Sequence, residues 1–223
     1  AARTVYMYTG SLYFAKYVLG NEAVYSILTI LVVPGGAIAT VLIPWFTKHF
    51  GKKNTYIYVH VLGAVVMFAM YFIGRNGGYN NSSNLLWLAI GFVLLGLPQG
   101  INNVITYAMI GDTVEYLEWK TGERAEGICF SMQTFINKIS MAVGAFIGVM
   151  AYGISGISPS DPYNTVTPEG SEKLWAVLIL SGAISMVATI IPMLFYKVTE
   201  SKQREYVKEI EERKAAKAAK TAE

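Results

Sequence analysis

The residue whose type and position most suggest chemistry is Lys138, which lies inside a long apolar stretch at residues 127–152. If that stretch is helical, Lys138 stands about 12 residues, or ~18 Å, from its start. The same side of the helix carries Ser131, Gln133, Thr134 and Asn137. All of these positions fall within an arc of roughly 160° at 100° per residue. A charged side chain at this depth in a membrane is costly and usually marks a functional site.

A polar stripe on a membrane helix is expected to face the bundle interior or a water-filled cavity, where amides and hydroxyls suit a polar ligand. The alternative is a structural lysine that joins two helices through a buried ion pair. Either role requires a carboxylate, and the apolar segments of this chain contain no Asp or Glu. We therefore expect the partner of Lys138 in a part of the protein upstream of Ala1.

A second candidate ligand face lies in the apolar segment before the charged residues 111–126. Asn103 and Tyr107 are four residues apart and so share a helix face. Pro98 predicts a broken helix there, which would free a backbone carbonyl at mid-depth. Tyr13 is a further candidate, because a phenol can pack on a sugar ring and hydrogen-bond its hydroxyls. The alternatives are hydrogen bonds between helices for the amides and ordinary packing for Tyr13.

Charged side chains of both signs cluster at residues 111–126, where we expect a short loop. The candidates for an ion-pair gate are Asp112, Glu115, Lys120 and Arg124. A single surface ion pair contributes about 0–1 kcal/mol, which suits a contact that opens and closes. The alternative is a plain solvated loop. Residues 50–53, FGKK, are expected to belong to the same layer.

The composition indicates an all-α, polytopic membrane protein. Of the 223 residues, 53% are hydrophobic and only 15% are charged, whereas a soluble domain carries about 25% charged residues. Long apolar runs predict six membrane-spanning helices within a bundle at 1–197, at about 4–19, 23–46, 55–74, 85–110, 127–152 and 174–197. Pro34-Gly35-Gly36 predicts a kink in the second of these. Residues 198–223 are charged and predict a surface helix, with Glu200/Arg204 and Glu209/Arg213 pairs.

Basic residues favour one side of the predicted bundle, which identifies that side as cytoplasmic and places both ends of the chain there. They are Lys48, Lys52, Lys53, Lys120, Arg124, Lys197, Lys202, Arg204 and Lys208, against Arg75 and Lys173 on the other side. A net charge of +3 does not predict a nucleic-acid partner. Neither a catalytic constellation nor a metal-ligand spacing is present around Cys129 and the two histidines, so we expect no enzyme and no metal site.

Two motifs resemble a known family. GDTVEYLEWKTGERAEG at 111–127, followed by SMQTFINK at 131–138, is similar to the cytoplasmic loop and eleventh helix of the glycoside–pentoside–hexuronide:cation symporters. This is the melibiose permease family of the major facilitator superfamily. FAKYVLGNEAVYS, FTKHFGKK and PQGINNVITYAMIGDTVEY extend the resemblance over nearly the whole chain. The resemblance implies helices 7–12, the C-terminal half, of a twelve-helix carrier in the cell inner membrane.

The resemblance also implies a function and roles for particular residues. It implies symport of a sugar, glycoside or uronide with Na⁺ or H⁺, by alternating access between two six-helix halves, with no other cofactor. Gln133, Thr134 and Lys138 match residues that line the sugar and cation cavity, and Asn103 stands where melibiose permease has a tryptophan, which suggests a different sugar. The family's cation site uses acidic residues of the N-terminal half, the implied partner. The alternative is a non-transporting or lipid-handling membrane protein of the same fold.

Overall fold

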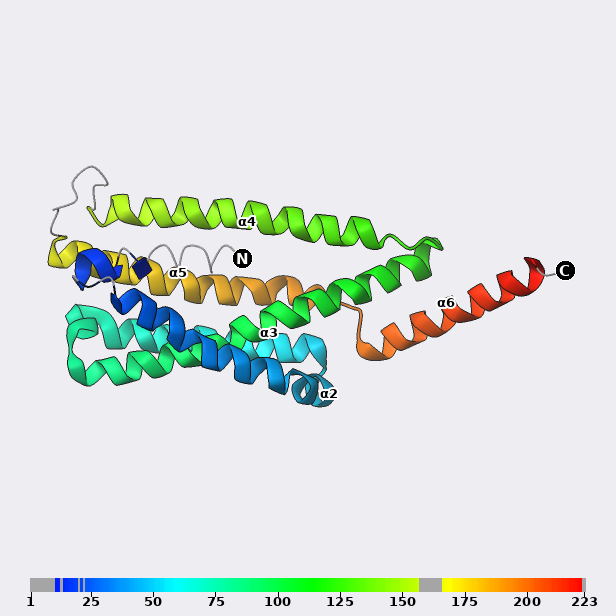
Figure 1. Cartoon of the computed structure of the whole chain (residues 1–223), viewed down its shortest axis with the longest axis horizontal. Coiled ribbons are helices and arrows are strands. Elements are labelled where there is room, and N and C mark those ends of the chain that lie inside the picture. Colours follow the sequence, from blue (N-terminus) through cyan, green and yellow to red (C-terminus); the bar gives the residue numbers. More distant parts are fainter. Residues whose placement is uncertain (1–10, 13, 20, 22, 157–165, 222–223) are drawn as a thin grey trace.

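The described elements of the chain are all helical. In the computed structural model, residues 11, 12, 14–19, 21, 23–156 and 166–221 are described. The elements are η1 (Phe14–Val18), α2 (Ala23–Gly74), η2 (Arg75–Asn80), α3 (Ser82–Thr121), α4 (Glu126–Ile154), α5 (Pro168–Phe195) and α6 (Glu200–Thr221). Helices α2 to α5 form an elongated bundle, and α6 projects from one end of it (Figure 1). The all-helical prediction is confirmed for this part of the chain.

Helix α2 is two helical arms joined at Gly51. Its backbone leaves the helical region there, with φ 76° and ψ 161°, a conformation that glycine adopts readily. The chain reverses at this point, so the second arm runs back along the bundle (Figure 1). The arms contain the predicted spans 23–46 and 55–74. The connection between these two spans is shorter than their predicted bounds imply, because residues 47–53 are helical except for Gly51.

The first arm of α2 crosses α3 with backbone against backbone. A Cβ added to Gly35 would overlap the carbonyl oxygen of Val93, and one added to Gly96 would overlap that of Val32. Helix α3 continues through Pro98, so the break expected there is wrong. The kink expected at Pro34, inside α2, stays a prediction. The glycines beside these prolines permit a close helix crossing.

Helix α3 is 40 residues long and has a recognisable signal at each end. The Asn81 side chain accepts a hydrogen bond from Ser83 N at 3.0 Å, and Gly122 ends the helix in the left-handed conformation. At 1.5 Å per residue the helix is about 60 Å long, whereas a bilayer core is about 30 Å thick. The end that carries Asp112, Glu115 and Glu118 therefore projects beyond the apolar layer. The loop expected over 111–126 is wrong as far as Thr121.

Four of the described helices, α2 to α5, are long and apolar enough to cross a membrane. The larger core cluster packs Met67 and Met70 of α2 against Leu88 and Phe92 of α3 and Leu174 of α5. Most of the first predicted span, 4–19, lies outside the described residues, as does Tyr13. The count of six spans and the placement as one half of a larger fold stay predictions.

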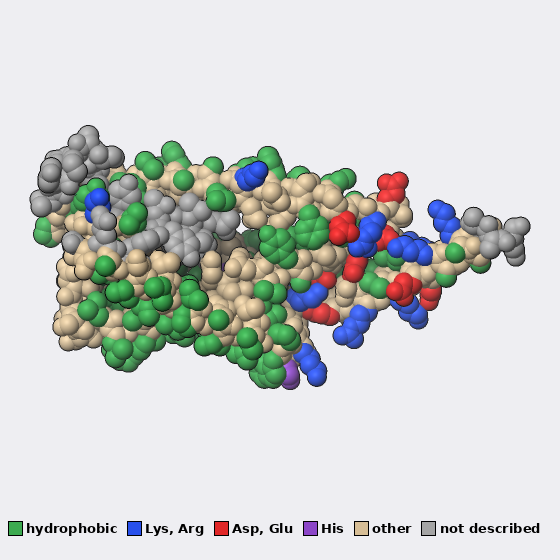
Figure 2. All heavy atoms as spheres, viewed as in Figure 1, with side chains coloured by type: hydrophobic (Ala, Val, Ile, Leu, Met, Phe, Trp, Pro, Cys, Tyr) green, Lys and Arg blue, Asp and Glu red, His purple; other side chains and the backbone are tan. Residues whose placement is uncertain are grey.

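Charged side chains gather at one end of the bundle and along α6 (Figure 2). At that end Lys52 of α2 binds Asp112 of α3, and Lys214 of α6 binds Glu118. Arg75 and Lys173 lie together elsewhere, lining a cavity of about 300 Å³ with Tyr71 and Trp175. The basic groups thus separate as the sequence predicts. Which end is cytoplasmic stays a prediction.

Candidate functional site

The candidate ligand residues of α4 divide between two faces of the helix. Gln133 and Asn137 are half-buried, whereas Thr134 and Lys138 are exposed. The buried residues of α4 follow the same spacing of three and four as Gln133 and Asn137, namely Gly144, Gly148, Ala151 and Tyr152. Lys138 is about 100° around the helix from Asn137. The predicted single stripe therefore separates into a pair of amides directed toward the bundle and a cation on an open side.

Lys138 forms neither a hydrogen bond nor an ion pair within the described part of the chain. Thr134 beside it uses its hydroxyl internally, donating to the carbonyl of Phe130 at 3.0 Å. Ile139 and Phe146, on the other side of α4, are also exposed. The side of α4 that carries Lys138 is thus open for contact with other parts of the protein.

The polar residues of α3 after Pro98 separate in the same way. Asn102 is half-buried and accepts a hydrogen bond from the Tyr56 hydroxyl at 3.1 Å. Asn103 and Tyr107 are exposed, on the next face of the helix. No hydrogen bond among the described residues joins Asn103 or Tyr107 to the α4 candidates. Their role in ligand binding stays a prediction.

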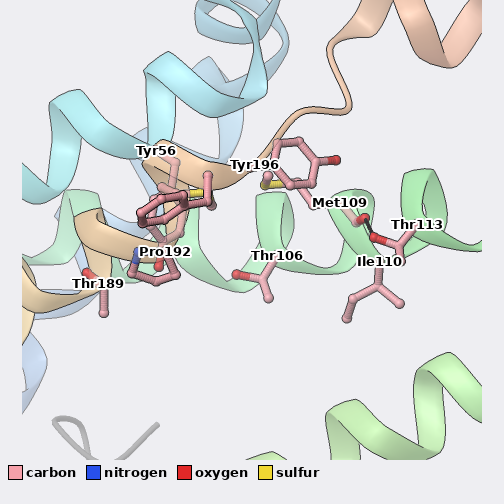
Figure 3. A pocket seen from close by; sticks show the side chains of 10 residues that line it. Tyr56, Thr106, Met109, Ile110, Thr113, Thr189, Pro192 and Tyr196 are labelled. Atoms are coloured by element: carbon pink, nitrogen blue, oxygen red, sulfur yellow. Dashed lines mark hydrogen bonds between the residues drawn. The ribbon is translucent and has the colours of Figure 1, made fainter. Parts of the chain in front are cut away.

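A cavity of about 450 Å³ lies between the second arm of α2, the middle of α3 and the end of α5 (Figure 3). Most of its lining is apolar, and the lining includes five hydroxyl-bearing residues, namely Tyr56, Thr106, Thr113, Thr189 and Tyr196. The sequence analysis missed this cavity, because its walls come from three helices far apart in the chain. The hydroxyl-bearing side chains are spaced too widely in the sequence to signal a common site.

Asp112 is the centre of the first group of charged contacts at the end of the bundle. Its carboxylate accepts hydrogen bonds from Lys52 Nζ at 2.6 and 2.7 Å and from the Tyr196 hydroxyl at 3.3 Å. Burial, followed by the charge of Asp112, raises the pKa of the Tyr196 phenol. A tyrosine phenol is protonated near neutral pH, so Tyr196 can donate to Asp112. The expectation that FGKK shares a layer with this region is confirmed by Lys52.

Two further acidic residues continue from Asp112 along α3 at intervals of three. Glu115 accepts a hydrogen bond from the Gln203 amide of α6 at 2.6 Å. Glu118 accepts one from Arg124 at 3.1 Å through Oε2 and one from Lys214 at 2.6 Å through Oε1. Asp112 thus holds α2 against α3, and Glu115 and Glu118 both hold α6 there. We call Asp112, Glu115 and Glu118 the acidic ladder.

Arg124 and Lys120 complete the predicted gate set in different ways. Arg124 lies in the connection between α3 and α4, and its Nε is 3.1 Å from Glu126. Hydrogen bonds to Glu126 and then to Glu118 raise the pKa of its guanidinium. Lys120 is exposed, with its Nζ 5.9 Å from the centre of the Tyr116 ring. Three of the four predicted gate residues therefore have partners within this chain, and Lys120 faces outward.

Helix α6 packs on the projecting end of α3, which the sequence analysis did not predict. Trp119 donates its indole N–H to Glu209 at 2.7 Å, and its carbonyl accepts from Arg213 at 2.7 Å. The Tyr206 ring lies 4.6 Å from the Trp119 ring, and Ile210 is buried. The available signal was the pair Tyr206 and Ile210, four residues apart in a charged segment.

The predicted ion pairs within α6 have different outcomes. The Glu209–Arg213 pair is confirmed at 3.2 Å. The Glu200–Arg204 pair does not form within the described chain, because Glu200 accepts a hydrogen bond from the backbone N–H of Lys52 instead. Glu200 thereby holds the beginning of α6 against the reversal of α2 at Gly51.

A sequence model of the family described as MFS/sugar transport protein matches residues 1–200. The chain belongs to this family. It is 27% identical over 205 residues to the glucuronide carrier protein homolog of Escherichia coli (strain K12), covering 92% of this chain and 43% of that protein. It is 31% identical over 203 residues to a putative sulfoquinovose importer of the same organism, covering 91% of this chain and 41% of that importer. It is 28% identical over 205 residues to the raffinose carrier protein of Pediococcus pentosaceus, covering 89% of this chain and 30% of that carrier.

The chain thus spans less than half the length of these members of the MFS/sugar transport protein family. Residues 111–138 resemble part of known sugar carriers, and the family match confirms this resemblance. The related family members are carriers and transporters, which are not enzymes. The family match and the four long apolar helices indicate a multi-pass membrane protein.

Proposed function

We propose that this chain is the C-terminal half of a secondary carrier that moves a sugar, glycoside, pentoside or hexuronide together with Na⁺ or H⁺. The family match and the names of its relatives support a sugar or glycoside as the substrate class. The chain covers less than half of each cited relative, which fits a carrier of two halves that move against each other. The segregated basic residues favour the cytoplasmic membrane, with α6 in the cytoplasm.

The observation that carries the proposal is the open, polar side of α4. Lys138 and Thr134 are exposed there, while Gln133 and Asn137 are directed toward the bundle. An ammonium group at this depth needs a carboxylate, and the described chain does not provide one. A carboxylate from the N-terminal half fills this role, so that Lys138 neutralises and senses that carboxylate and couples cation occupancy to the state of the cavity. Gln133, Thr134, Asn137 and Asn103 bind substrate hydroxyls, together with Tyr107 and Tyr13.

The inner gate lies at the charged end of the bundle. Asp112, Glu115 and Arg124 give it a rigid base through their contacts within this chain. Lys120 reaches outward from this base toward the other half. No cofactor other than the coupling cation enters the proposal.

The test is uptake of radiolabelled sugars by the full-length carrier in membrane vesicles, with a glucuronide, raffinose and isoprimeverose as substrates. Gradients of Na⁺ and of H⁺ are imposed separately. Lys138→Ala is expected to abolish accumulation against a gradient, because the response to the cation is lost, while exchange of sugar across the membrane continues. Lys202→Ala removes an exposed lysine of α6 and is the matched control.

Two results would count against the proposal, and they are distinct. Unchanged accumulation by Lys138→Ala would remove the coupling role from this residue. Absence of uptake of every sugar by the unaltered carrier, with correct membrane insertion, would exclude sugar transport itself.

A further inference from the structure

The first half of α4 is packed more loosely within the described chain than the second half. All four buried residues of α4 lie between Gly144 and Tyr152, and residues 126–143 include none. The candidate ligand residues Gln133 to Lys138 are all in this first half. Their placement therefore depends strongly on how α4 begins.

The beginning of α4 is joined to α3 by a short bridge. Gly122 ends α3 with a φ of 80°, and its N–H donates to the carbonyl of Glu118 at 2.8 Å. Two residues later, Arg124 reaches back to the Glu118 carboxylate and forward to Glu126, the first residue of α4. One guanidinium thus connects the last turn of α3 to the first turn of α4.

Glu118 is also where the tail helix attaches. Its side chain is only 6% exposed, so its charge requires partners. One oxygen accepts from Arg124, and the other accepts from Lys214 of α6 at 2.6 Å. The attachment of α6 and the beginning of α4 therefore share a single carboxylate.

We propose that Glu118 is a positioning residue that fixes the beginning of α4, and with it the placement of Lys138 and its neighbours, and that α6 supports Glu118 through Lys214. The proposal rests on the proposed function, because it concerns the positioning of that substrate site. It assigns α6 a part in substrate binding although α6 does not touch the substrate. Loss of the Glu118 charge frees Arg124, and the connection at Gly122 then allows α4 to shift.

Cys129, in the first turn of α4 and half-buried, reports on this shift. The experiment uses the full-length carrier in vesicles and measures the rate of N-ethylmaleimide labelling of the peptide that contains Cys129, by mass spectrometry. We expect Glu118→Gln to change this rate several-fold and to raise the KM for sugar uptake more than it lowers kcat. Glu123→Gln is the matched control, since it removes the same charge from an exposed side chain five residues away in the same connection.

Single variants of the two partners separate the contributions of the bridge and the tail. Arg124→Gln is expected to change the labelling rate as much as Glu118→Gln, and Lys214→Gln to change it less. The double variant Glu118→Lys with Lys214→Glu exchanges the two charges and so restores the ion pair with α6. The lysine at position 118 repels Arg124, so the labelling rate should remain altered.

An unchanged labelling rate in Glu118→Gln and Arg124→Gln, with normal amounts of inserted protein, would overturn the proposal. So would an equal change in Glu123→Gln. The labelling rate does not depend on a transported sugar. It therefore tests the positioning role even if the transport proposal fails.

Discussion

The crossing of α2 and α3 offers a sharp test at two adjacent residues, Gly35 and Gly36. A Cβ on Gly35 would overlap the carbonyl oxygen of Val93. A Cβ on Gly36 would lie 3.6 Å from the carbonyl oxygen of Gly96, which is an ordinary van der Waals distance. Both substitutions to alanine change the helix in the same way, so their difference isolates the steric contact. Gly35→Ala should destabilise the protein, whereas Gly36→Ala should not.

The expected magnitude follows from two opposing contributions. Overpacking costs about 1–3 kcal/mol, and the upper end applies here because the opposing atoms belong to the backbone and cannot rotate away. Replacing glycine by alanine inside a helix gains up to about 1 kcal/mol. Gly35→Ala should therefore lose about 2 kcal/mol of unfolding free energy. Gly36→Ala should change it by between zero and a gain of about 1 kcal/mol.

The measurement is equilibrium unfolding of the purified protein in mixed micelles, followed by circular dichroism. Expression and insertion are compared first, so that a difference in unfolding is not a difference in yield. Equal unfolding free energies for Gly35→Ala and Gly36→Ala would refute the close crossing of α2 and α3. A loss for Gly36→Ala that matches the loss for Gly35→Ala would refute it as well.

Two further predictions concern the ends of the bundle. Gly74→Ala would place a Cβ within the ring of Trp175, which is 5% exposed. This substitution should lower the unfolding free energy by about 1–3 kcal/mol and shift the tryptophan emission. An unchanged emission spectrum and an unchanged stability would contradict this packing. The ion pair of Lys52 and Asp112 is largely shielded from solvent, since the Asp112 side chain is 7% exposed and that of Lys52 is 23% exposed. Lys52→Met and Asp112→Asn should therefore each destabilise the protein. Their double-mutant cycle should give a coupling free energy of about 1–3 kcal/mol. A coupling near zero would show that the ion pair does not contribute.

The apolar pattern predicted where helices lie better than where they end. Runs such as 174–197 contain no charged residue before Lys197, so their helical core was evident from the sequence. The predicted helix ends are wrong where a helix continues into charged sequence, as α3 does to Thr121. Asp112, Glu115 and Glu118 recur at intervals of three, which is a helical spacing, and this was the signal that a loop was the wrong expectation.

The glycines beside the prolines, and not the prolines alone, determine how α2 and α3 pack. Pro98 lies inside a continuous α3, and the residue pattern does not indicate how closely another helix approaches it. Gly96 allows the backbone of α2 to come near, and that contact is a property of two segments about 60 residues apart. Partners of this kind, like Lys52 and Asp112, depend on the folded arrangement. The sequence could predict only that the residue types suit such contacts.

The acidic ladder also limits what can join this chain to another half. Ion pairs that close a gate between two halves must connect groups from different halves, and Asp112, Glu115 and Glu118 already bind partners in this chain. Among the four predicted gate residues, Lys120 is exposed and its described contact is with an aromatic ring rather than a carboxylate. A ring contact of this kind contributes about 0.5–1 kcal/mol at an exposed site, so an acidic side chain can displace it. In the proposed gate, opening therefore requires little disruption of the ladder, because the contact with the other half would be made by Lys120.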